Sequence, residues 1–383
     1  PFLDGAVVPP GAEDVYDTPR TSVRQATVYE HASLAIDKSL RVGAHGLPLM
    51  GGGDWNDGMN RVGHEGRGES VWLGWFACAL VAGFAPLARQ RGDAARAQRW
   101  EAAAAGWQGA LLANAWDGHW YLRAFFDNGQ PLGASASREA RIDLIAQAWA
   151  VLSGVAPPQR QREALAAVHS HLADEAAGLL RLLDPPLRTQ QPSAGYIQSY
   201  PPGVRENGGQ YSHGAVWALM AQAAWATGPE GSAAARDTVY RWFTWLSPAH
   251  RTAHPTRGAA YGLEPYVMAG DICSAPPHVG RGGWSWYTGA AAWMHRAALE
   301  AVFGLRQGSQ SLHFEPCLPS TWPRATLTLT RDGRRMHFIF QQGDATTLAA
   351  AAVHEGAVLL QAGQAVEWRA LPPESRFLVP LPV

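Results

Sequence analysis

Apolar residues recur at helical spacing along most of this chain, and that pattern restricts the possible folds more than any other feature. Such periodicity, with capping residues at the segment ends, marks eight stretches before residue 305. We predict helices near residues 24–42, 70–90, 94–114, 139–153, 159–174, 213–227, 232–247 and 286–304. The chain is therefore expected to be mainly α-helical.

The pattern changes after about Leu305 to short runs that alternate or are rich in β-branched residues. Turn signals such as Arg331 to Gly333 separate these runs. The runs read SLHFEP, ATLTLTR, RMHFIF, TTLAAAAV, VEWRA and FLVPLPV. We predict a helical domain over residues 1–306 and an all-β domain, a small antiparallel β-sandwich, over residues 307–383.

Three loops between the predicted helices, at residues 43–69, 175–212 and 248–285, are longer than a simple bundle needs. They are rich in Gly, Pro, His and aromatic residues, and long structured loops usually carry function. Helical hairpins arranged in a ring with such loops at one mouth are typical of carbohydrate-active (α/α)6 toroids. A closed ring of six hairpins needs twelve helices, and the sequence predicts eight. We therefore expect an incomplete toroid whose N-terminal part lies outside this sequence.

The overall charge argues against a polyanionic partner. The formal net charge is -1 and the isoelectric point is about 7.1, which excludes the basic footprint of a nucleic-acid-binding protein. Three isolated cysteines and no signal-peptide pattern indicate a reducing compartment. We predict a cytoplasmic location. The sequence has no CxxC motif and no paired-His spacing of the kind that would predict a metal site.

One uncharged segment, from Ser70 to Ala88, has the length of a membrane span. It contains Gly74, Gly83 and Pro86, and the neighbouring segments are amphipathic. We therefore interpret it as a helix buried in a protein core rather than as a transmembrane helix.

The stretch GGGDWNDGMN, residues 51–60, is the most informative motif for function. Glycines let the backbone approach a ligand closely, and Trp55 offers an apolar face for a sugar ring. The same composition is typical of a capping turn, so both interpretations stay open on composition alone. Asp54 is interpreted as a turn residue rather than as a sugar ligand.

Two further clusters couple glycines to groups that can donate or accept protons: PPGVRENGGQYSHG at 201–214 and GRGGWSWYTGAAAWM at 280–294. Each candidate also has a structural interpretation. His213 could be a capping or core histidine, and Glu206 could be a surface acid paired with Arg205. Thr288 and Gly289 could simply pack at a helix start.

The string GDWNDGMNRVGHEGRGESVWLGWF resembles the glycoside phosphorylases of glycoside hydrolase family 94, the cellobiose/chitobiose phosphorylase family. It is most similar to the C-terminal, phosphorylase-like region of cyclic β-1,2-glucan synthases. Further matching motifs include FLDG, YEHASLAIDKSL, GAHGLPLMG, WDGHWYLRAFFDNG, RIDLIAQAWAVLSG, YPPGVRENGGQYSHGAVWA and WSWYTGAAAWMHR. The resemblance covers nearly the whole chain.

This resemblance implies roles for six residues. The second aspartate of the DWND motif, Asp57, corresponds to the general acid. The other implied site residues are Trp55 and Glu206 for the sugar, and His213, Thr288 and Gly289 for phosphate. The family's upstream arginines and N-terminal β-sandwich have no counterpart in this sequence, which leaves open whether this segment alone is active.

The resemblance also implies the co-substrate and the partners. Inorganic phosphate is the expected co-substrate, with no cofactor and no metal ion. The expected partners are a β-glucan oligosaccharide and the missing N-terminal part of the same polypeptide, and a homodimer is one assembly to test.

The implied chemistry is consistent with the residue types. Inverting cleavage of a β-glycoside needs an acid for the leaving oxygen and a nucleophile on the opposite face. Phosphate is already an anionic nucleophile, so one acid and an anion cradle suffice. We expect phosphorolysis of a β-linked glucan, β-1,2 by resemblance, to α-glucose 1-phosphate, with Asp57 buried beside Asp54. The alternatives are an inverting hydrolase using Glu206 or Glu69 as base, and a non-catalytic glucan-binding module.

Overall fold

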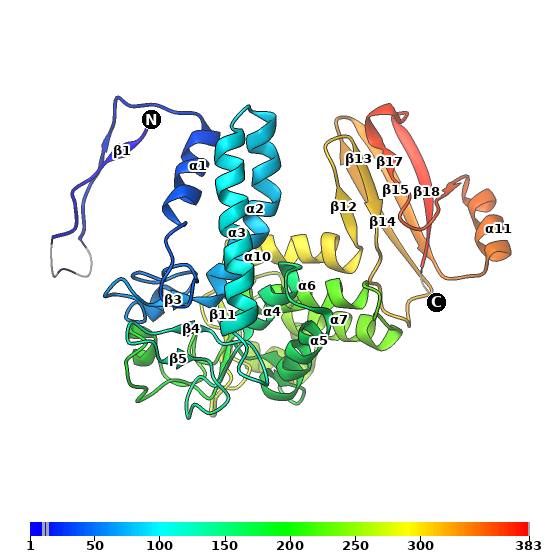
Figure 1. Cartoon of the computed structure of the whole chain (residues 1–383). Coiled ribbons are helices and arrows are strands. Elements are labelled where there is room, and N and C mark those ends of the chain that lie inside the picture. The colour runs from blue at the N-terminus through cyan, green and yellow to red at the C-terminus, as the bar shows by residue number, and fades with distance from the viewer. Residues whose placement is uncertain (10–11, 13–14, 382–383) are drawn as a thin grey trace.

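The computed structural model describes residues 1–9, 12 and 15–381, and it contains a helical body followed by a strand-rich C-terminal region (Figure 1). All eight predicted helices are present. Their bounds are α1 (Val28–Lys38), α2 (Val71–Gln90), α3 (Ala94–Asn114), α4 (Leu144–Leu152), α5 (Pro158–Ala167), α6 (Ser212–Ala226), α7 (Ala233–Leu246) and α10 (Thr288–Arg296). The prediction of a mainly helical body is confirmed.

Two short helices were not predicted, α8 (Pro248–Ala253) and α9 (Pro255–Tyr261), and both lie in the expected loop 248–285. Each has proline in its first turn, where the missing N–H costs no helical hydrogen bond. Proline content predicts a loop for residues 248–285, whereas at Pro248 and Pro255 proline starts a helix.

Most helices of the body begin where a short polar side chain accepts a backbone N–H. Thr27, Ser70 and Asp93 cap α1, α2 and α3 in this way. The starts of α6 and α10 differ, because their N-cap residues, Tyr211 and Tyr287, make no such bond within the described chain. Tyr211 and Tyr287 therefore leave the first turns of α6 and α10 without a side-chain cap, although the Ser212 N–H donates to the Gly270 carbonyl.

The core of the helical body is built on tryptophan. The fully buried tryptophans in it are Trp75, Trp100, Trp107 and Trp242. Helix α2 packs against α3 and α4, and α2 and α3 run side by side (Figure 1). Among the described residues, α2 is the one helix with the length and apolar composition of a membrane span, and half of its most apolar window is buried. Its packing agrees with the predicted core helix.

The long loops gather at one end of the helices and are tied together by two- and three-stranded sheets. One contains β3 (Glu69–Ser70), β4 (Ala124–Phe125) and β5 (Pro131–Leu132). Another pairs β10 (Gln210–Tyr211) with β11 (Asp271–Ile272) in antiparallel register. Two more pairs are β6 (Ile142–Asp143) with β9 (Leu183–Asp184) and β7 (Ala173–Asp174) with β8 (Leu179–Leu180). The pair β1 (Leu3–Asp4) with β2 (Arg20–Thr21) lies before α1, outside these loops (Figure 1). Pairing of β10 with β11 brings the second and third long loops together.

The C-terminal region contains a three-stranded and a four-stranded sheet. The smaller one is antiparallel, in the order β12 (Leu305–Gln307), β13 (Ser311–Phe314), β17 (Val366–Glu367). The larger one has the order β14 (Arg324–Arg331), β15 (Arg334–Gln341), β18 (Glu374–Pro380), β16 (Val358–Leu359). The location of the strands agrees with the sequence pattern, whereas the domain boundary at residue 306 stays a prediction.

Two features of this region correct the expected all-β antiparallel architecture. Strand β18 pairs in parallel with both β15 and β16, and the run TTLAAAAV belongs to a helix, α11 (Ala345–Glu355). Asp344 caps this helix, alanine favours it, and Gly356 ends it in a left-handed conformation. The crossover through α11 is what allows β15 and β16 to run in the same direction.

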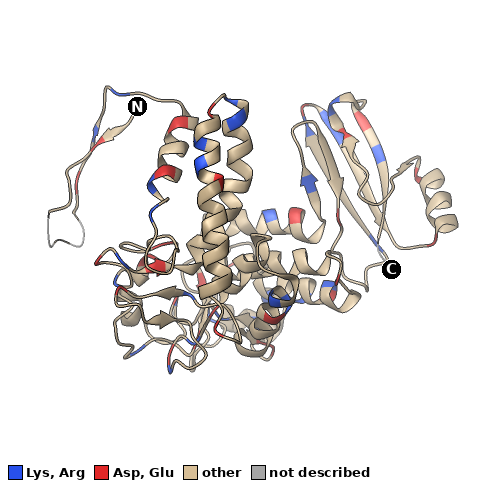
Figure 2. Ribbon diagram, viewed as in Figure 1, with Lys and Arg blue, Asp and Glu red and all other residues tan. Residues whose placement is uncertain are grey.

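Positive and negative side chains are interspersed over the body and the C-terminal sheets (Figure 2). This distribution agrees with the small net charge of -1.

Candidate active site

A cavity of about 330 Å³ lies where the three glycine-rich loop clusters meet. Its lining residues are Trp55, Asp57, Arg205, Glu206, Tyr211, His213 and Tyr287. Four of the six predicted site residues are among them. The fold thus brings together residues that are up to 232 positions apart in the sequence, between Trp55 and Tyr287.

The turn that carries Asp57 is shaped by its neighbours. Gly53 has φ +130°, and a Cβ there would lie 3.1 Å from the Asp57 Cα. The Asn56 side chain accepts the Gly58 N–H and caps a 3-10 turn over Asp57–Met59. This arrangement leaves the Asp57 side chain exposed. The expectation of a buried Asp57 is therefore wrong, because the turn buries Gly58 and Met59 instead.

Tyr196 is a neighbour of Asp57 that the sequence did not single out. Burial, followed by a hydrogen bond with Asp57, raises the pKa of Tyr196 to about 12. The phenol thus stays protonated at neutral pH and can donate to the carboxylate.

Asp54 has a structural role in the turn, which agrees with its interpretation as a turn residue. Its carboxylate accepts two hydrogen bonds from Arg123, at 2.6 and 2.7 Å, and one from Ser70 at 2.5 Å. Burial alone would raise the pKa of Asp54, but the Arg123 charge and these bonds lower it below its ordinary value. Asp54 is thus a charged carboxylate whose two oxygens are both hydrogen-bonded within the protein, and it does not line the cavity.

His213 lies in the first turn of α6, among tryptophan rings. The Trp55 indole Nε1 donates to His213 Nδ1 at 3.1 Å, and the Trp217 ring centroid lies 4.2 Å from the imidazole. His213 Nε2 has no hydrogen-bond partner among the described residues. Burial lowers the pKa of His213 to about 4, so the ring is neutral at pH 7.

Glu206 is 5% exposed, which contradicts its interpretation as a surface acid. Its Oε2 lies 3.3 Å from Arg205 Nε and receives no hydrogen bond within the described chain. A buried carboxylate oxygen that still has a free acceptor position suits a ligand hydroxyl. Glu206 can therefore bind a sugar hydroxyl in this cavity.

Arg205 is one of three lining residues, with Tyr211 and Tyr287, that the sequence interpretation did not place in the site; it considered Arg205 only as a partner for Glu206. Its backbone has φ +53°, and its N–H donates to Asp271 Oδ2 at 2.8 Å. The guanidinium lies over the rings of Tyr200 and Trp284, at 4.7 and 4.5 Å. The sequence feature that could have placed Arg205 in the site is its position beside Glu206 in the same glycine-rich cluster.

The first turns of α6 and α10 converge at this cavity. Their N-cap residues, Tyr211 and Tyr287, both line it and share a hydrogen bond of 2.9 Å between their hydroxyls. Helix starts with free N–H groups favour anions. Thr288 and Gly289 are exposed in the first turn of α10, directly after Tyr287, although they are not lining residues themselves.

Glu69, the other carboxylate considered as a base, is structural. It is 1% exposed and accepts the backbone N–H groups of His45 and Leu47. It lies outside the cavity lining, so Glu206 is the one lining carboxylate besides Asp57. In the part of the chain that the structure describes, no group of three or more His, Cys, Asp or Glu side chains could hold a metal ion.

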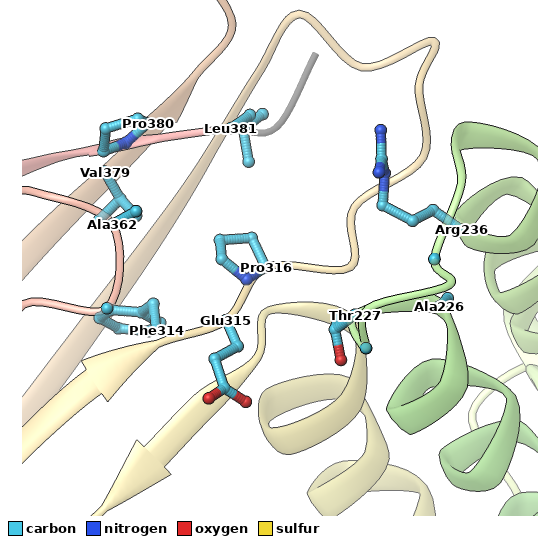
Figure 3. A pocket seen from close by; sticks show the side chains of 13 residues that line it. Ala226, Thr227, Arg236, Phe314, Glu315, Pro316, Ala362, Val379, Pro380 and Leu381 are labelled. Carbon is cyan, nitrogen blue, oxygen red and sulfur yellow. The ribbon is translucent and has the colours of Figure 1, made fainter. Parts of the chain in front are cut away.

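A larger cavity of about 490 Å³ lies between the helical body and the C-terminal strands (Figure 3). Arg236 enters it from the helical side, and Pro316, Val379 and Leu381 enter it from the strand side. None of the predicted site residues lines this cavity. Four of them line the smaller cavity instead.

Comparison with known proteins identifies relatives of two kinds. The chain is 43% identical over 324 residues to "Cyclic beta-(1,2)-glucan synthase NdvB" of Rhizobium meliloti (strain 1021), covering 84% of this chain and 11% of that protein. It is 35% identical over 304 residues to "Solabiose phosphorylase" of Paenibacillus borealis, covering 79% of this chain and 38% of that protein. The chain thus spans a minor part of the length of both relatives.

The fold also resembles that of a solved structure described as "Sialidase", with a TM-score of 0.54 and 10% identity. The similar region covers 78% of this chain and 26% of that one. At this identity the likeness concerns the fold alone. The family described as "Glycosyl hydrolase 94 superfamily, catalytic domain" matches residues 7–304. Since that match covers more than half of the sequence, this chain belongs to the glycosyl hydrolase 94 superfamily.

Proposed function

We propose that this chain is the catalytic region of an inverting glycoside phosphorylase that cleaves a β-linked glucan, specifically a β-1,2-glucooligosaccharide. The helices would form part of an (α/α)6 toroid, followed by the C-terminal β-domain. One observation carries the proposal: Asp57 shares a cavity with His213, Arg205 and the N-caps of two helices that lack side-chain caps. Phosphorolysis needs an acid and an anion-binding site within one cavity.

In the proposed reaction, Asp57 protonates the glycosidic oxygen as the bond between that oxygen and the anomeric carbon breaks. A phosphate oxygen attacks the anomeric carbon from the opposite face and forms the new bond. The configuration inverts, so a β-glycoside and phosphate give α-glucose 1-phosphate and a glucan shortened by one residue. Asp57 regains its proton from solvent, to which it is exposed.

The other lining residues have proposed roles that follow from their chemistry. Trp55 and Glu206 bind the sugar, the first by its ring and the second by its free acceptor oxygen. The phosphate would be held by His213, the Arg205 guanidinium, and the Thr288 and Gly289 groups at the start of α10. No cofactor or metal takes part in this scheme.

The preference for a β-1,2 linkage is supported by the 43% identity to a protein named as a cyclic β-(1,2)-glucan synthase. Because the chain covers 11% of that relative, the activity of the whole polypeptide is part of the proposal. A cytoplasmic location, as a region of an inner-membrane protein, belongs to it as well. The three buried free cysteines are compatible with a reducing compartment.

The test is a phosphate-dependent assay on a panel of glucan linkages. Incubation with β-1,2-glucooligosaccharides and inorganic phosphate should release glucose 1-phosphate. Asp57→Asn should lower kcat by about 10²–10⁴-fold, the usual contribution of a general acid. Asp332→Asn, in an exposed hairpin turn of the C-terminal region, is the matched control and should keep full activity. Equal activity of the Asp57 variant would refute the assignment.

Glu206 supports a second candidate, an inverting hydrolase. It lines the same cavity as Asp57 and could activate water in place of phosphate. That enzyme would release glucose at the same rate without phosphate, and Glu206→Gln would abolish the release. Binding of the glucan without any turnover would instead indicate a glucan-binding module.

A further inference from the structure

The hydrogen bond between Trp55 and His213 determines which imidazole nitrogen carries a proton. An indole Nε1–H can only donate, and here it donates to His213 Nδ1 at 3.1 Å. Nδ1 must therefore be the acceptor, without a proton of its own. In a neutral imidazole the proton then resides on Nε2, because one nitrogen is the donor and the other the acceptor.

The same bond opposes the imidazolium form. Protonation of Nδ1 would bring two N–H groups face to face, which the 3.1 Å separation does not accommodate. Burial acts in the same direction by lowering the pKa of His213 to about 4. At neutral pH, His213 is therefore a neutral donor.

His213 Nε2 is the atom that remains available to a ligand. It is buried and has no hydrogen-bond partner among the residues that the structure describes. A buried donor without a partner is rare in native proteins, and because His213 lines the cavity, this one points to an acceptor bound there. The acceptor sites of a phosphate oxygen match such an N–H.

We infer that Trp55 is a positioning residue for the anion site, because its indole N–H holds His213 in the tautomer whose Nε2–H donates to a phosphate oxygen. For the identity of the ligand, this inference rests on the proposed function. It adds to Trp55 a second role besides its sugar-facing ring. The two roles differ in the atoms they use, the indole nitrogen for the histidine and the ring face for the sugar.

Trp217 provides a matched control. Its ring lies closer to the imidazole than that of Trp55, at 4.2 against 5.5 Å between centroids. Its indole nitrogen, however, is buried without a hydrogen-bond partner in the described structure. Trp217→Phe thus removes the same atoms from the same aromatic cluster without removing the bond to His213.

The first experiment measures the tautomer directly, by ¹⁵N–¹H correlation spectra of the histidine-labelled protein at pH 7. The chain contains 14 histidines, and the His213 signals are assigned by their loss in His213→Asn. The wild type and Trp217→Phe should both show a single Nε2–H form. Trp55→Phe should show a mixture with the Nδ1–H form. An Nδ1–H form in the wild type, or an unchanged spectrum of Trp55→Phe, overturns the inference.

Phosphate binding separates this inference from the proposed function. Added inorganic phosphate should shift the Nε2 resonance in the wild type, and the shift should need about tenfold more phosphate in Trp55→Phe but not in Trp217→Phe. An Nε2 resonance that does not respond to phosphate refutes the inference, whatever the activity. A normal response without formation of glucose 1-phosphate supports the inference and refutes only the phosphorylase proposal.

Discussion

Arg123 lies at the centre of a buried charge cluster behind the turn that carries Asp57. It forms two hydrogen bonds with Asp54, while its Nε lies 3.4 Å from the carboxylate of Asp143. One guanidinium thus serves two acids unequally. Burial raises the pKa of Asp143 to about 6, and the Arg123 charge only partly opposes this, whereas the pKa of Asp54 is lowered.

Because Arg123 bonds Asp54 more strongly than Asp143, we predict different losses of stability when each aspartate is replaced by asparagine. Asp54→Asn should destabilise the protein by about 3–5 kcal/mol, because it leaves Arg123 buried without its main partner. Asp143→Asn should cost about 1 kcal/mol or less, since asparagine can still cap α4 and the lost contact is weak. Urea unfolding at pH 7 measures both values. Equal losses would show that Asp143, too, is a principal partner of Arg123.

The lowered pKa of His213 predicts that part of the free energy of unfolding is lost in acid. Its pKa is about 4 in the folded protein and 6.5 in the reference state, so the unfolded chain takes up a proton first as the pH falls. The free energy of unfolding should therefore decrease from pH 6.5 to pH 4. At pH 4.5 this component amounts to about 2–3 kcal/mol.

The measurement compares urea unfolding at pH 7.5 and pH 4.5 for the wild type and His213→Asn. The variant should lose less stability on acidification, by the amount given above. His354→Asn, at an exposed position on α11, is the control and should follow the wild type. Identical acid profiles for all three proteins would contradict the burial of a neutral His213.

Among the elements, the turn at residues 51–60, which carries the proposed general acid Asp57, contacts the segment after Gly195. Gly195 has φ +126°, and a Cβ there would lie 2.2 Å from Asn60 Oδ1 and 2.7 Å from the Gly58 carbonyl. The 3-10 turn over Tyr196–Ser199, which carries the Tyr196 neighbour of Asp57, begins directly after it. Glycine is required at this close approach.

We predict that Gly195→Ala separates these two segments, with a loss of about 1–3 kcal/mol and a larger loss of phosphorolysis. Gly52→Ala is the control within the same turn, because a Cβ there would meet nothing within 4 Å. Circular dichroism checks that the helices remain, and the assay for glucose 1-phosphate measures activity. Retained activity in Gly195→Ala would show that this contact is dispensable.

The helices show what can be predicted at the level of elements. Periodicity and caps located α1 to α7 and α10, because most of these helices bury one face, α4 and α6 are long apolar runs buried nearly all round, and most begin at a polar cap. The error at TTLAAAAV arose because a short run of alanines after two threonines fits both patterns. Only the cap at Asp344 and the left-handed Gly356 decide for the helix.

For the whole molecule, binding of phosphate should couple to stability. A ligand that binds only the folded state, at 100 times its dissociation constant, adds about 2.7 kcal/mol. Phosphate should therefore raise the midpoint of thermal unfolding by on the order of 3 °C over chloride at equal ionic strength. Arg205→Gln should abolish most of the rise. Arg241→Gln, on α7 and outside the cavity, should keep it.

The control for this measurement is sulfate, which carries a similar charge. A rise with sulfate equal to that with phosphate would indicate binding of any oxyanion at the two helix starts. The absence of a rise with either anion would contradict the phosphate site.

The sequence by itself determined the helical body, the position of the C-terminal strands, the family and the three clusters that supply the cavity. These depend on local periodicity, caps and motif strings, which are properties of neighbouring residues. The tertiary structure decided the parallel pairing of β18, the exposure of Asp57, the recruitment of Arg205 and the bond from Trp55 to His213. The strand pairing, the recruitment of Arg205 and the bond to His213 each join residues distant in sequence. The exposure of Asp57, like hydrogen-bond geometry, depends on how the chain packs in three dimensions.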